Sequence, residues 1–354
     1  MKKLLLFFIM LNGTCMAIEI SGIRYATETD EGIRFARFRD DVLAMPSHQL
    51  GLNPKKARNT SGGIIAFSSD AKEITADFEV LSANYMGAGF GIFENGELIE
   101  ECKFNAKAKE VTLSFQSKYG GESVFEIALP SFANVMLQGL ETNCIGAQRI
   151  ASEGPSFFQL LEKKKGGQSA CYVALGDSIT HGVGQDGFGH KTWPFLLARK
   201  LDMELFNLAV GGGKVSVPVG EMLEDWKEID LITILVGYND LHFNDKNPQL
   251  YKADYTRLLD AIRANHPKTK IVCISLLHTK KPVAQKTGHT VDEFRAALEQ
   301  LVAERNDPDL MLIKGETVSS ERNLRVDKPQ DPVHLSIEGA ELLAHELFKR
   351  IRVL

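Results

Sequence analysis

The sequence predicts two domains, an antiparallel β-sandwich followed by an α/β domain on a doubly wound parallel sheet. Three observations lead to this prediction. The chain has 354 residues, enough for two domains that each bury a core. Up to about Gln159, short runs of alternating apolar and polar residues are separated by turn residues. From Ala170 onward, short apolar runs alternate with amphipathic helical stretches.

The first half is predicted to be a β-sandwich domain over residues 18–160. Asn95-Gly96 separates two of its apolar runs and is typical of a type I′ hairpin turn. A polar linker is expected over 161–169, where three lysines precede two glycines. The strands expected from the alternation are 64–67, 73–80, 89–93, 97–100, 111–115 and 124–129.

The second half, residues 170–354, is predicted to be a three-layer, flavodoxin-like domain with five parallel strands. The strand runs are apolar on both faces, as buried parallel strands are. Thr290 and Glu293 form a capping box, and Ser336 is a suitable N-cap for the closing helix through Ile351. The expected strands are 171–175, 204–208, 231–236, 271–276 and 310–313, and the other expected helices are 193–200, 252–265 and 291–305.

The first 17 residues are predicted to be a secretory signal peptide. Lys2 and Lys3 precede a short apolar run, and Cys15 and Ala17 place small residues at the −3 and −1 positions of a cleavage site. The run is too short to span a bilayer. A membrane anchor, a misassigned start and a lipoprotein signal ending at Cys15 are the alternatives, and Asn12 disfavours the last. We therefore expect a secreted or periplasmic protein.

Composition and cysteine content disfavour two classes of protein, those that bind nucleic acid and those held together by many disulfides. The net charge is −5 and the sequence has no basic run, which disfavours nucleic-acid binding. The cysteines are too few for a disulfide framework. Cys171 and Cys273 lie in apolar strand runs and are expected to be buried thiols, whereas Cys102 and Cys144 are candidates for a disulfide pair.

Four short segments, each after a predicted strand or in the last loop, carry the residues that acyl transfer requires. A serine needs a base to take its proton, the base needs a carboxylate to orient it, and the oxyanion needs hydrogen-bond donors. Because ligands bind beyond the carboxyl ends of parallel strands, these segments should meet at one edge. The segments are Gly176–Thr180, Asn207–Gly212, Gly237–Asp240 and Asp331–His334.

These segments resemble the conserved blocks of the SGNH (GDSL) hydrolases, and the resemblance covers about residues 171–354. It implies that Ser178 is the nucleophile, His334 the general base and Asp331 its orienting carboxylate. The fold is expected to be that of the family, and no metal or organic cofactor is required. The usual Gly-x-Ser-x-Gly elbow of α/β-hydrolases is absent around Ser178.

The resemblance also implies three oxyanion donors, namely the Ser178 amide, the Gly212 amide and the Asn239 side chain. Gly211 and Gly213 flank Gly212, so the register of the glycine donor is open by one residue. The alternative is a purely structural role, in which these residues only form turns after strands.

The remaining polar residues near the strand ends have simpler interpretations. Asp177 and Asp240 are expected to organise loops by accepting hydrogen bonds from backbone amides. A metal site on these two carboxylates and His334 is conceivable, but a serine triad accounts for them more simply. Solvated loop positions are expected for the other histidines, with a place in the pocket lining as the alternative for His181 and His242. These histidines are His181, His190, His242, His278 and His289.

We expect a secreted serine esterase. A sandwich before an SGNH domain resembles two-domain carbohydrate esterases, in which a jelly-roll module precedes the hydrolase, and this implies acetyl esters on a glycan. A lipase or arylesterase, an acyltransferase with the same triad, and a non-catalytic glycan-binding protein are the alternatives. The sandwich could also serve only to shape the pocket, and oligomeric state is open.

Overall fold

The computed structural model describes residues 6–11, 14–142, 170–243 and 246–353, and within them the chain divides into two compact units. The β unit comprises the described residues of Met1–Arg37, Arg58–Ser169 and Asp186–His190. The α/β unit comprises those of Phe38–Ala57, Ala170–Gln185 and Lys191–Leu354. The predicted domains are continuous in sequence, whereas the compact units are not. Residues 38–57 from the first half belong to the α/β unit, and residues 186–190 from the second half belong to the β unit. The predicted linker and Cys144 lie outside the described residues.

The β unit contains two antiparallel sheets, which confirms the predicted sandwich class, and its jelly-roll connectivity stays a prediction. The six-stranded sheet has the order β1-β2-β5-β10-β7-β8, and the five-stranded sheet has the order β3-β4-β11-β6-β9. The strands are β1 (Leu6–Leu11), β2 (Thr14–Ser21), β3 (Tyr25–Thr29), β4 (Gly32–Ala36), β5 (Ile64–Ser69), β6 (Glu73–Ala83), β7 (Gly89–Glu94), β8 (Glu97–Lys103), β9 (Glu110–Gln116), β10 (Ser123–Ala128) and β11 (Ala133–Thr142).

The core of the β unit follows from the alternation seen in the sequence. In β6, Ile74, Ala76, Phe78 and Val80 are buried while their neighbours are more exposed. Strands from both sheets contribute to one buried apolar cluster. The Asn95-Gly96 turn has positive φ at both residues, 51° and 83°, as a type I′ hairpin requires. This hairpin prediction is confirmed.

The predicted cleavage point after Ala17 falls within β2. Strand β1 pairs with β2 alone among the named strands, whereas Glu19–Ser21 of β2 pair with β5. Ile18 and Ile20 are buried in the core cluster. Cleavage after Ala17 would therefore remove β1 and leave the part of β2 that is joined to β5. The signal peptide itself stays a prediction.

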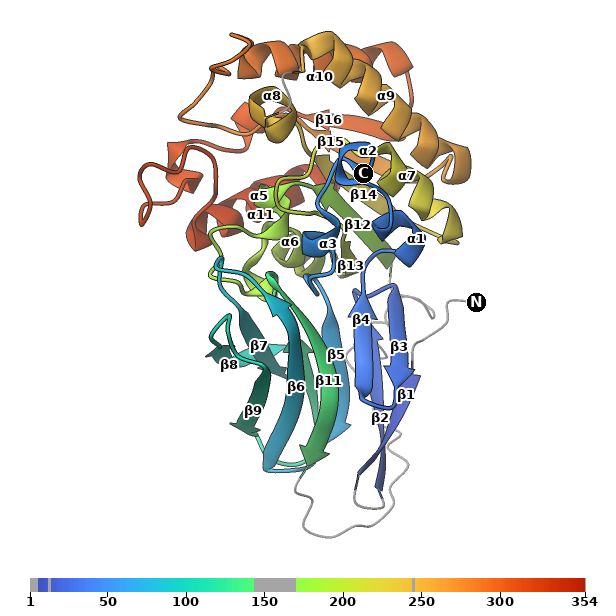
Figure 1. Cartoon of the computed structure of the whole chain (residues 1–354), viewed down its shortest axis with the longest axis vertical. Helices are drawn as coiled ribbons and strands as arrows, with labels where there is room; N and C mark the ends of the chain where they lie inside the picture. The colour runs from blue at the N-terminus through green and yellow to red at the C-terminus, as the bar shows by residue number, and fades with distance from the viewer. Residues whose placement is uncertain (1–5, 12–13, 143–169, 244–245, 354) are drawn as a thin grey trace. The chain divides into compact units, whose positions relative to one another are not determined.

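The α/β unit is built on a parallel sheet with the order β13-β12-β14-β15-β16 (Figure 1). In chain order this is 2-1-3-4-5, the flavodoxin-like arrangement, so the predicted fold class is confirmed. From β12 the chain first adds β13 on one side of it and then returns to add β14 on the other side. The carboxyl end of β12 is therefore at the topological switch point. The strands are β12 (Ala170–Gly176), β13 (Met203–Asn207), β14 (Leu231–Leu235), β15 (Lys270–Ile274) and β16 (Leu310–Ile313).

The helices of this unit begin where the sequence provides caps. Thr290 and Glu293 form the predicted capping box, and Ser336 Oγ accepts a hydrogen bond from the Gly339 amide. In the described residues, no helix is long and apolar enough to cross a membrane. The helices are α5 (Ser178–His181), α6 (Trp193–Leu201), α7 (Val217–Met222), α8 (Tyr238–Phe243), α9 (Pro248–Asn265), α10 (Val291–Arg305) and α11 (Ile337–Ile351).

A segment from the first half of the chain, residues 38–57, belongs to the α/β unit. It forms the short helices α1 (Asp40–Leu43), α2 (Ser47–Leu50) and α3 (Pro54–Ala57). The Lys214 amide donates to the Gly51 carbonyl at 2.8 Å, and Ser216 Oγ donates to the Leu50 carbonyl at 2.6 Å. These bonds join the segment to the loop that follows the glycine run Gly211–Gly213.

Cys102, Cys171 and Cys273 are free thiols. Cys171 and Cys273 are buried in strands of the parallel sheet, as predicted. Burial raises the pKa of Cys273 to about 12, which makes it unreactive. Cys102 is a half-buried free thiol, and its candidate partner Cys144 lies outside the described residues.

Candidate active site

The tight turn after β12 presents Ser178. Asp177 ends the strand and caps α5, its Oδ1 accepting the Ile179 amide at 3.0 Å. Ser178 is then the first residue of the helix. Only glycine fits at position 176, because an added Cβ would lie 2.3 Å from Thr180 Oγ1 and 2.8 Å from the Leu235 carbonyl oxygen. This packing places Ser178 at the carboxyl end of β12.

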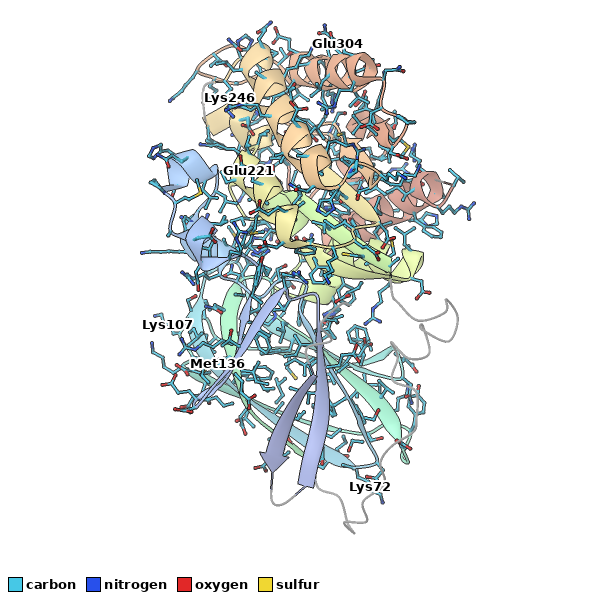
Figure 2. All side chains as sticks on the ribbon, turned by 90° about the vertical axis from the view of Figure 1, so that its right-hand side faces the viewer. Lys72, Lys107, Met136, Glu221, Lys246 and Glu304 are labelled. Atoms are coloured by element: carbon cyan, nitrogen blue, oxygen red, sulfur yellow. The ribbon has the colours of Figure 1, made fainter. Side chains whose placement is uncertain are left out.

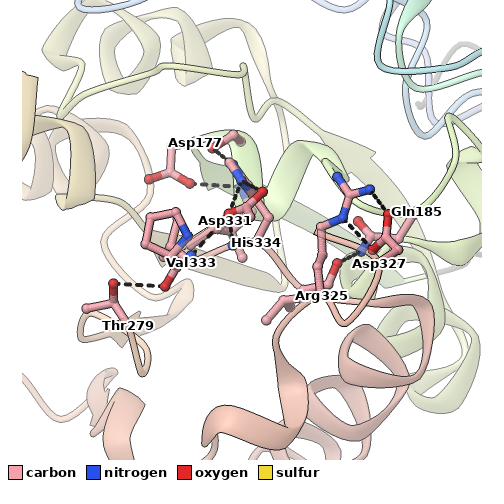
Figure 3. Close-up of polar contacts among 12 residues, drawn as sticks. Asp177, Gln185, Thr279, Arg325, Asp327, Asp331, Val333 and His334 are labelled. Carbon is pink, nitrogen blue, oxygen red and sulfur yellow. Dashed lines mark hydrogen bonds and ion pairs between the residues drawn. The ribbon is translucent and has the colours of Figure 1, made fainter. Parts of the chain in front are cut away.

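Ser178, His334 and Asp331 are joined by hydrogen bonds, although 156 residues separate the serine from the histidine in the sequence. His334 Nε2 lies 2.8 Å from Ser178 Oγ. His334 Nδ1 lies 2.9 and 2.8 Å from the two carboxylate oxygens of Asp331 (Figure 3). With its proton on Nδ1, the imidazole can accept the Ser178 proton at Nε2. The structure thus brings together the three residues that the sequence predicted.

Asp331 is held in place by its own loop. Its Oδ1 accepts hydrogen bonds from the amides of Val333 at 3.2 Å and His334 at 3.1 Å. Burial alone would raise the pKa of Asp331, but the hydrogen bond and positive charge of His334 and these two amides lower it well below its usual value. The carboxylate is therefore ionised at neutral pH and suited to stabilise a protonated His334.

The three glycines after β13 differ in what their amides do. The Gly211 amide donates to His181 Nδ1 at 2.9 Å, and the Gly213 amide donates to the Val210 carbonyl at 2.8 Å. Among the described residues, none accepts a hydrogen bond from the Gly212 amide. Gly212 also has φ of +84°, which glycine adopts without strain. These observations favour Gly212 as the glycine donor of the predicted oxyanion site.

Asn239 lies in the first turn of α8, directly after β14 and Gly237. It is 8% exposed, and its Nδ2 donates to the Gly213 carbonyl at 2.9 Å. The same nitrogen lies 3.4 Å from Asp177 Oδ2. The amide is therefore fixed beside both the glycine loop and the nucleophile turn, which joins the segments predicted to supply oxyanion donors.

Asp177 and Asp240 organise loops as predicted, and both are buried. Burial raises the pKa of Asp177 to about 7, although the Ile179 amide and His334 act in the opposite direction. Burial also raises the pKa of Asp240, opposed by Lys246 at 2.6 Å, and Asp240 accepts the Val215 amide at 3.2 Å. Among the described residues, no group of three or more His, Cys, Asp or Glu side chains could hold a metal ion.

Lys246 connects this loop to a second feature of the α/β unit. It contacts Asp254 at 2.6 Å as well as Asp240. Lys246 and Glu221, both labelled in Figure 2, belong to this unit. Both line a cavity of about 380 Å³. The cavity is separate from the Ser178–His334 pair, because neither residue lines it.

The expectation of solvated loop histidines is wrong for three of the five, since His242 lies in helix α8 with its Nε2 buried and two others are buried altogether. His181 is fully buried, because its ring fills the space beneath the glycine loop and accepts the Gly211 amide. His190 is 5% exposed and lies 2.8 Å from Glu101 within the β unit. Their loop positions in sequence carry no signal of this burial, since both partners are distant along the chain.

Comparisons with known proteins can now be set beside this geometry. The model of the GDSL-like lipase/acylhydrolase family matches residues 174–342. This range holds Ser178, the glycine loop, Asn239, Asp331 and His334. The chain carries a GDSL-like lipase/acylhydrolase domain.

Solved structures match the GDSL chain over nearly its whole length. The salicylyl-acyltransferase SsfX3 of a tetracycline biosynthetic pathway has a TM-score of 0.78, 18% identity, and coverage of 98% of this chain and 97% of that one. A structure described as a GDSL-like lipase, from Bacteroides ovatus, has a TM-score of 0.70, 19% identity and 94% coverage of each chain. An active-site mutant of a family two carbohydrate esterase from Clostridium thermocellum has a TM-score of 0.64 and 15% identity. The match covers 95% of this chain and 98% of that one. At these identities the likeness is one of fold.

A curated relative by sequence is an uncharacterized protein of Mycoplasma pneumoniae, 24% identical over 189 residues. The match covers 48% of this GDSL chain and spans about a fifth, 21%, of the relative.

Sequence reasoning missed a second layer that supports the Asp331–His334 loop of the GDSL domain. Thr279 Oγ1 donates to the Pro332 carbonyl at 3.0 Å, and the Lys280 amide donates to the same oxygen at 2.9 Å (Figure 3). Burial raises the pKa of Tyr238, and the Thr279 hydroxyl acts in the opposite direction. Two bonds from the loop after β15 thus support the loop that carries His334.

Sequence reasoning also missed Lys56, which α3 places at the glycine loop. Its Nζ donates to the Gly211 carbonyl at 3.3 Å. No local pattern in the sequence marks this contact, because 155 residues separate the two partners.

Proposed function

We propose that this protein is a secreted serine esterase that removes short acyl groups, acetyl above all, from a carbohydrate through an acyl-enzyme on Ser178. The observation that carries the proposal is the 2.8 Å contact of His334 Nε2 with Ser178 Oγ, with Asp331 on the opposite nitrogen. A serine hydroxyl becomes a useful nucleophile when a base lies within hydrogen-bond distance.

In the first half of the reaction, Ser178 Oγ attacks the ester carbonyl while His334 Nε2 takes the hydroxyl proton. Asp331 keeps the other imidazole proton on Nδ1 and stabilises the resulting imidazolium. The C–O bond to the leaving alcohol then breaks, and His334 gives its proton to that alcohol. The acyl group stays on Ser178 as an ester.

The negative charge that develops on the carbonyl oxygen is assigned to three donors, the Ser178 amide, the Gly212 amide and Asn239 Nδ2. No described residue accepts a hydrogen bond from either amide, so both are available to the substrate. Asn239 Nδ2 carries two protons: one goes to the Gly213 carbonyl at 2.9 Å, and the other makes a long hydrogen bond of 3.4 Å to Asp177 Oδ2, which a bound oxyanion would replace. Removing one such donor typically costs about 100- to 1,000-fold in rate.

In the second half, water adds to the acyl carbonyl while His334 takes one of its protons. The bond between the acyl carbon and Ser178 Oγ breaks, and His334 returns the proton to Oγ. The carboxylic acid leaves, and the free serine is restored. Every atom is supplied by the ester and by water, so the cycle needs no cofactor.

The carbohydrate and the acetyl group are supported by the likeness to family two carbohydrate esterases. These neighbours match both the β unit and the α/β unit, since the Clostridium thermocellum structure covers 95% of this chain. Fold similarity does not by itself transfer a substrate. The proposal therefore depends on direct measurement of acetate release.

An acyltransferase is the second candidate, and one observation favours it. The salicylyl-acyltransferase matches 98% of the chain at a TM-score of 0.78, higher than the carbohydrate esterases. The two activities share the acyl-enzyme and differ only in whether water or an alcohol attacks it. A lipase and a non-catalytic glycan-binding protein are the remaining alternatives.

The test is acid release by wild type and Ser178→Ala from acetylated polysaccharides and from p-nitrophenyl esters of increasing acyl length. Acetate release that falls with acyl length and is lost in the variant would support the esterase. Long-chain preference would point to a lipase, and ester formation with an added alcohol to an acyltransferase. Equal release by wild type and pure Ser178→Ala protein would refute catalysis by Ser178.

Export forms part of the proposal and has its own test. The protein recovered from the medium or periplasm of the expressing cell should begin at Ile18 when its intact mass is measured. Recovery of the full chain with Met1 in the cytosol would refute export.

A further inference from the structure

The ammonium group of Lys56 in α3 lies beside the glycine loop Gly211–Gly213, and the ester hydrolysis described above does not use it. Lys56 Nζ lies 3.3 Å from the Gly211 carbonyl, the residue before the proposed donor Gly212. A Cβ added at Gly212 would lie 3.9 Å from Lys56 Nζ and within 4 Å of no other heavy atom outside its neighbours in the chain. Beside Gly212, the space is therefore open except for this ammonium group.

Lys56 has no ion pair with any carboxylate in the described part of the chain. The acidic groups of the site are already engaged: Asp331 with His334, Asp240 with Lys246, and Asp177 with the Ile179 amide. The lysine is exposed, and among the described residues the Gly211 carbonyl is the one hydrogen-bond partner of its ammonium group. An ammonium group carries three donors, so Lys56 retains donors for a ligand.

The backbone that carries Lys56 is fixed to the same loop. Asn53 Oδ1 accepts the amides of Lys55 at 2.9 Å and Lys56 at 3.3 Å, which sets the start of α3. Gly51, in the left-handed conformation, accepts the Lys214 amide at 2.8 Å. The position of the ammonium group therefore follows the position of the glycine loop, as a specificity residue requires.

We propose that Lys56 selects esters that carry a carboxylate near the scissile bond. The inference rests on the proposed ester chemistry at Ser178 and names its substrate class. The carboxylate could lie in the alcohol part, as in an acetylated acidic sugar, or in the acyl part, as in the half ester of a dicarboxylic acid. In both cases the ammonium group pairs with a charge that is present before and during the reaction.

The experiment compares wild type, Lys56→Gln and Lys55→Gln on matched pairs of esters. Lys55 is the control because it is an exposed lysine of the same helix with no hydrogen bond to the glycine loop. For the alcohol part, para-acetoxybenzoate is compared with its methyl ester. For the acyl part, mono-p-nitrophenyl succinate is compared with p-nitrophenyl butyrate.

Wild type should favour the carboxylate-bearing member of one pair, and that pair identifies which part of the substrate carries the charge. Lys56→Gln should lower kcat/KM on that member by about 10- to 100-fold, the range for a hydrogen bond to a charged group. Its rate on the neutral member should change less than about twofold, and Lys55→Gln should match wild type on both. Added salt should slow wild type on the charged ester more than Lys56→Gln.

Three results would overturn the inference. An equal loss on charged and neutral esters would show that Lys56 acts on the oxyanion of every substrate. No loss on any ester, with an unchanged Tm, would show that Lys56 has no role in the reaction. An equal effect of Lys55→Gln would show a general effect of surface charge. Failure of the proposed function looks different, because wild type would then match Ser178→Ala on all four esters.

Discussion

The Gly211 amide donates a hydrogen bond to Nδ1 of the buried His181 at 2.9 Å. This contact requires the neutral imidazole with its proton on Nε2, since a protonated Nδ1 could not accept. It joins the end of the nucleophile helix α5 to the glycine loop. It also removes Gly211 from the set of free donors, which leaves Gly212 as the glycine available to an oxyanion.

His181→Ala should therefore weaken catalysis without touching the reacting groups. The Gly211 amide would lose its buried acceptor, which typically costs about 1–3 kcal/mol of stability, and the Gly212 amide would lose its fixed position. We expect kcat to fall about 10- to 100-fold with little change in KM, because oxyanion donors act mainly in the transition state. Steady-state kinetics on p-nitrophenyl acetate would measure this. His345→Ala, an exposed position on α11, is the control.

Asp331→Asn should lower kcat strongly. Both carboxylate oxygens lie within 2.9 Å of His334 Nδ1, so the aspartate fixes the tautomer that lets Nε2 accept a proton. Loss of the equivalent carboxylate in a serine triad costs about 10⁴-fold. Asp327→Asn provides a matched control, since Asp327 is an exposed partner of Arg325 in the same loop. A loss smaller than tenfold for Asp331→Asn would mean that Ser178 and His334 suffice.

Asp177 should make the protein less stable as the pH rises. Burial raises the pKa of Asp177 from its usual 3.8 to about 7 in the folded protein. Between these two pH values the folded chain therefore binds a proton that the unfolded chain has lost. The unfolding free energy of wild type minus that of Asp177→Asn should decrease from about pH 4 to about pH 7 and level off above. Urea unfolding at several pH values would measure this difference.

Asp331→Asn supplies a control of opposite sign for the Asp177 experiment. The pKa of Asp331 is lowered on folding, so its stabilisation is present above the unfolded pKa and is lost as the pH falls. The same subtraction for Asp331→Asn should therefore increase with pH in the acid range. Curves of the same slope for the two variants would contradict one of the two assignments, and the sign of the slope would show which.

Thr279→Val should lower activity through the position of the His334 loop. The variant keeps the volume of the side chain but removes the hydroxyl that donates to the Pro332 carbonyl at 3.0 Å. We expect a fall in kcat of about 2- to 13-fold, the rate equivalent of about 0.5–1.5 kcal/mol for one neutral hydrogen bond. Thr279→Ser should restore most of the rate. Equal rates for Thr279→Val and wild type would show that the Lys280 amide alone holds the loop.

The sequence by itself predicted the fold class, which the structure confirms, and the residues that we propose to react, because both predictions depend on local patterns. Strand and helix periods, together with caps such as Thr290, are set by neighbouring residues. The positions of Ser178 and Asn239 follow from the same patterns, since the carboxyl ends of parallel strands converge on one edge. The sequence alone therefore places the four motifs at one edge of the sheet.

The tertiary structure alone decided which polar groups have partners. Segment 38–57 joins the α/β unit through hydrogen bonds of Leu50 and Gly51, and its helices of four residues are too short to show a periodic pattern. The burial of His181, the choice of Gly212 and the place of Lys56 all depend on partners that the sequence order does not bring together. Hydrogen bonds between distant segments leave no local signature, because their geometry exists only once the chain has packed.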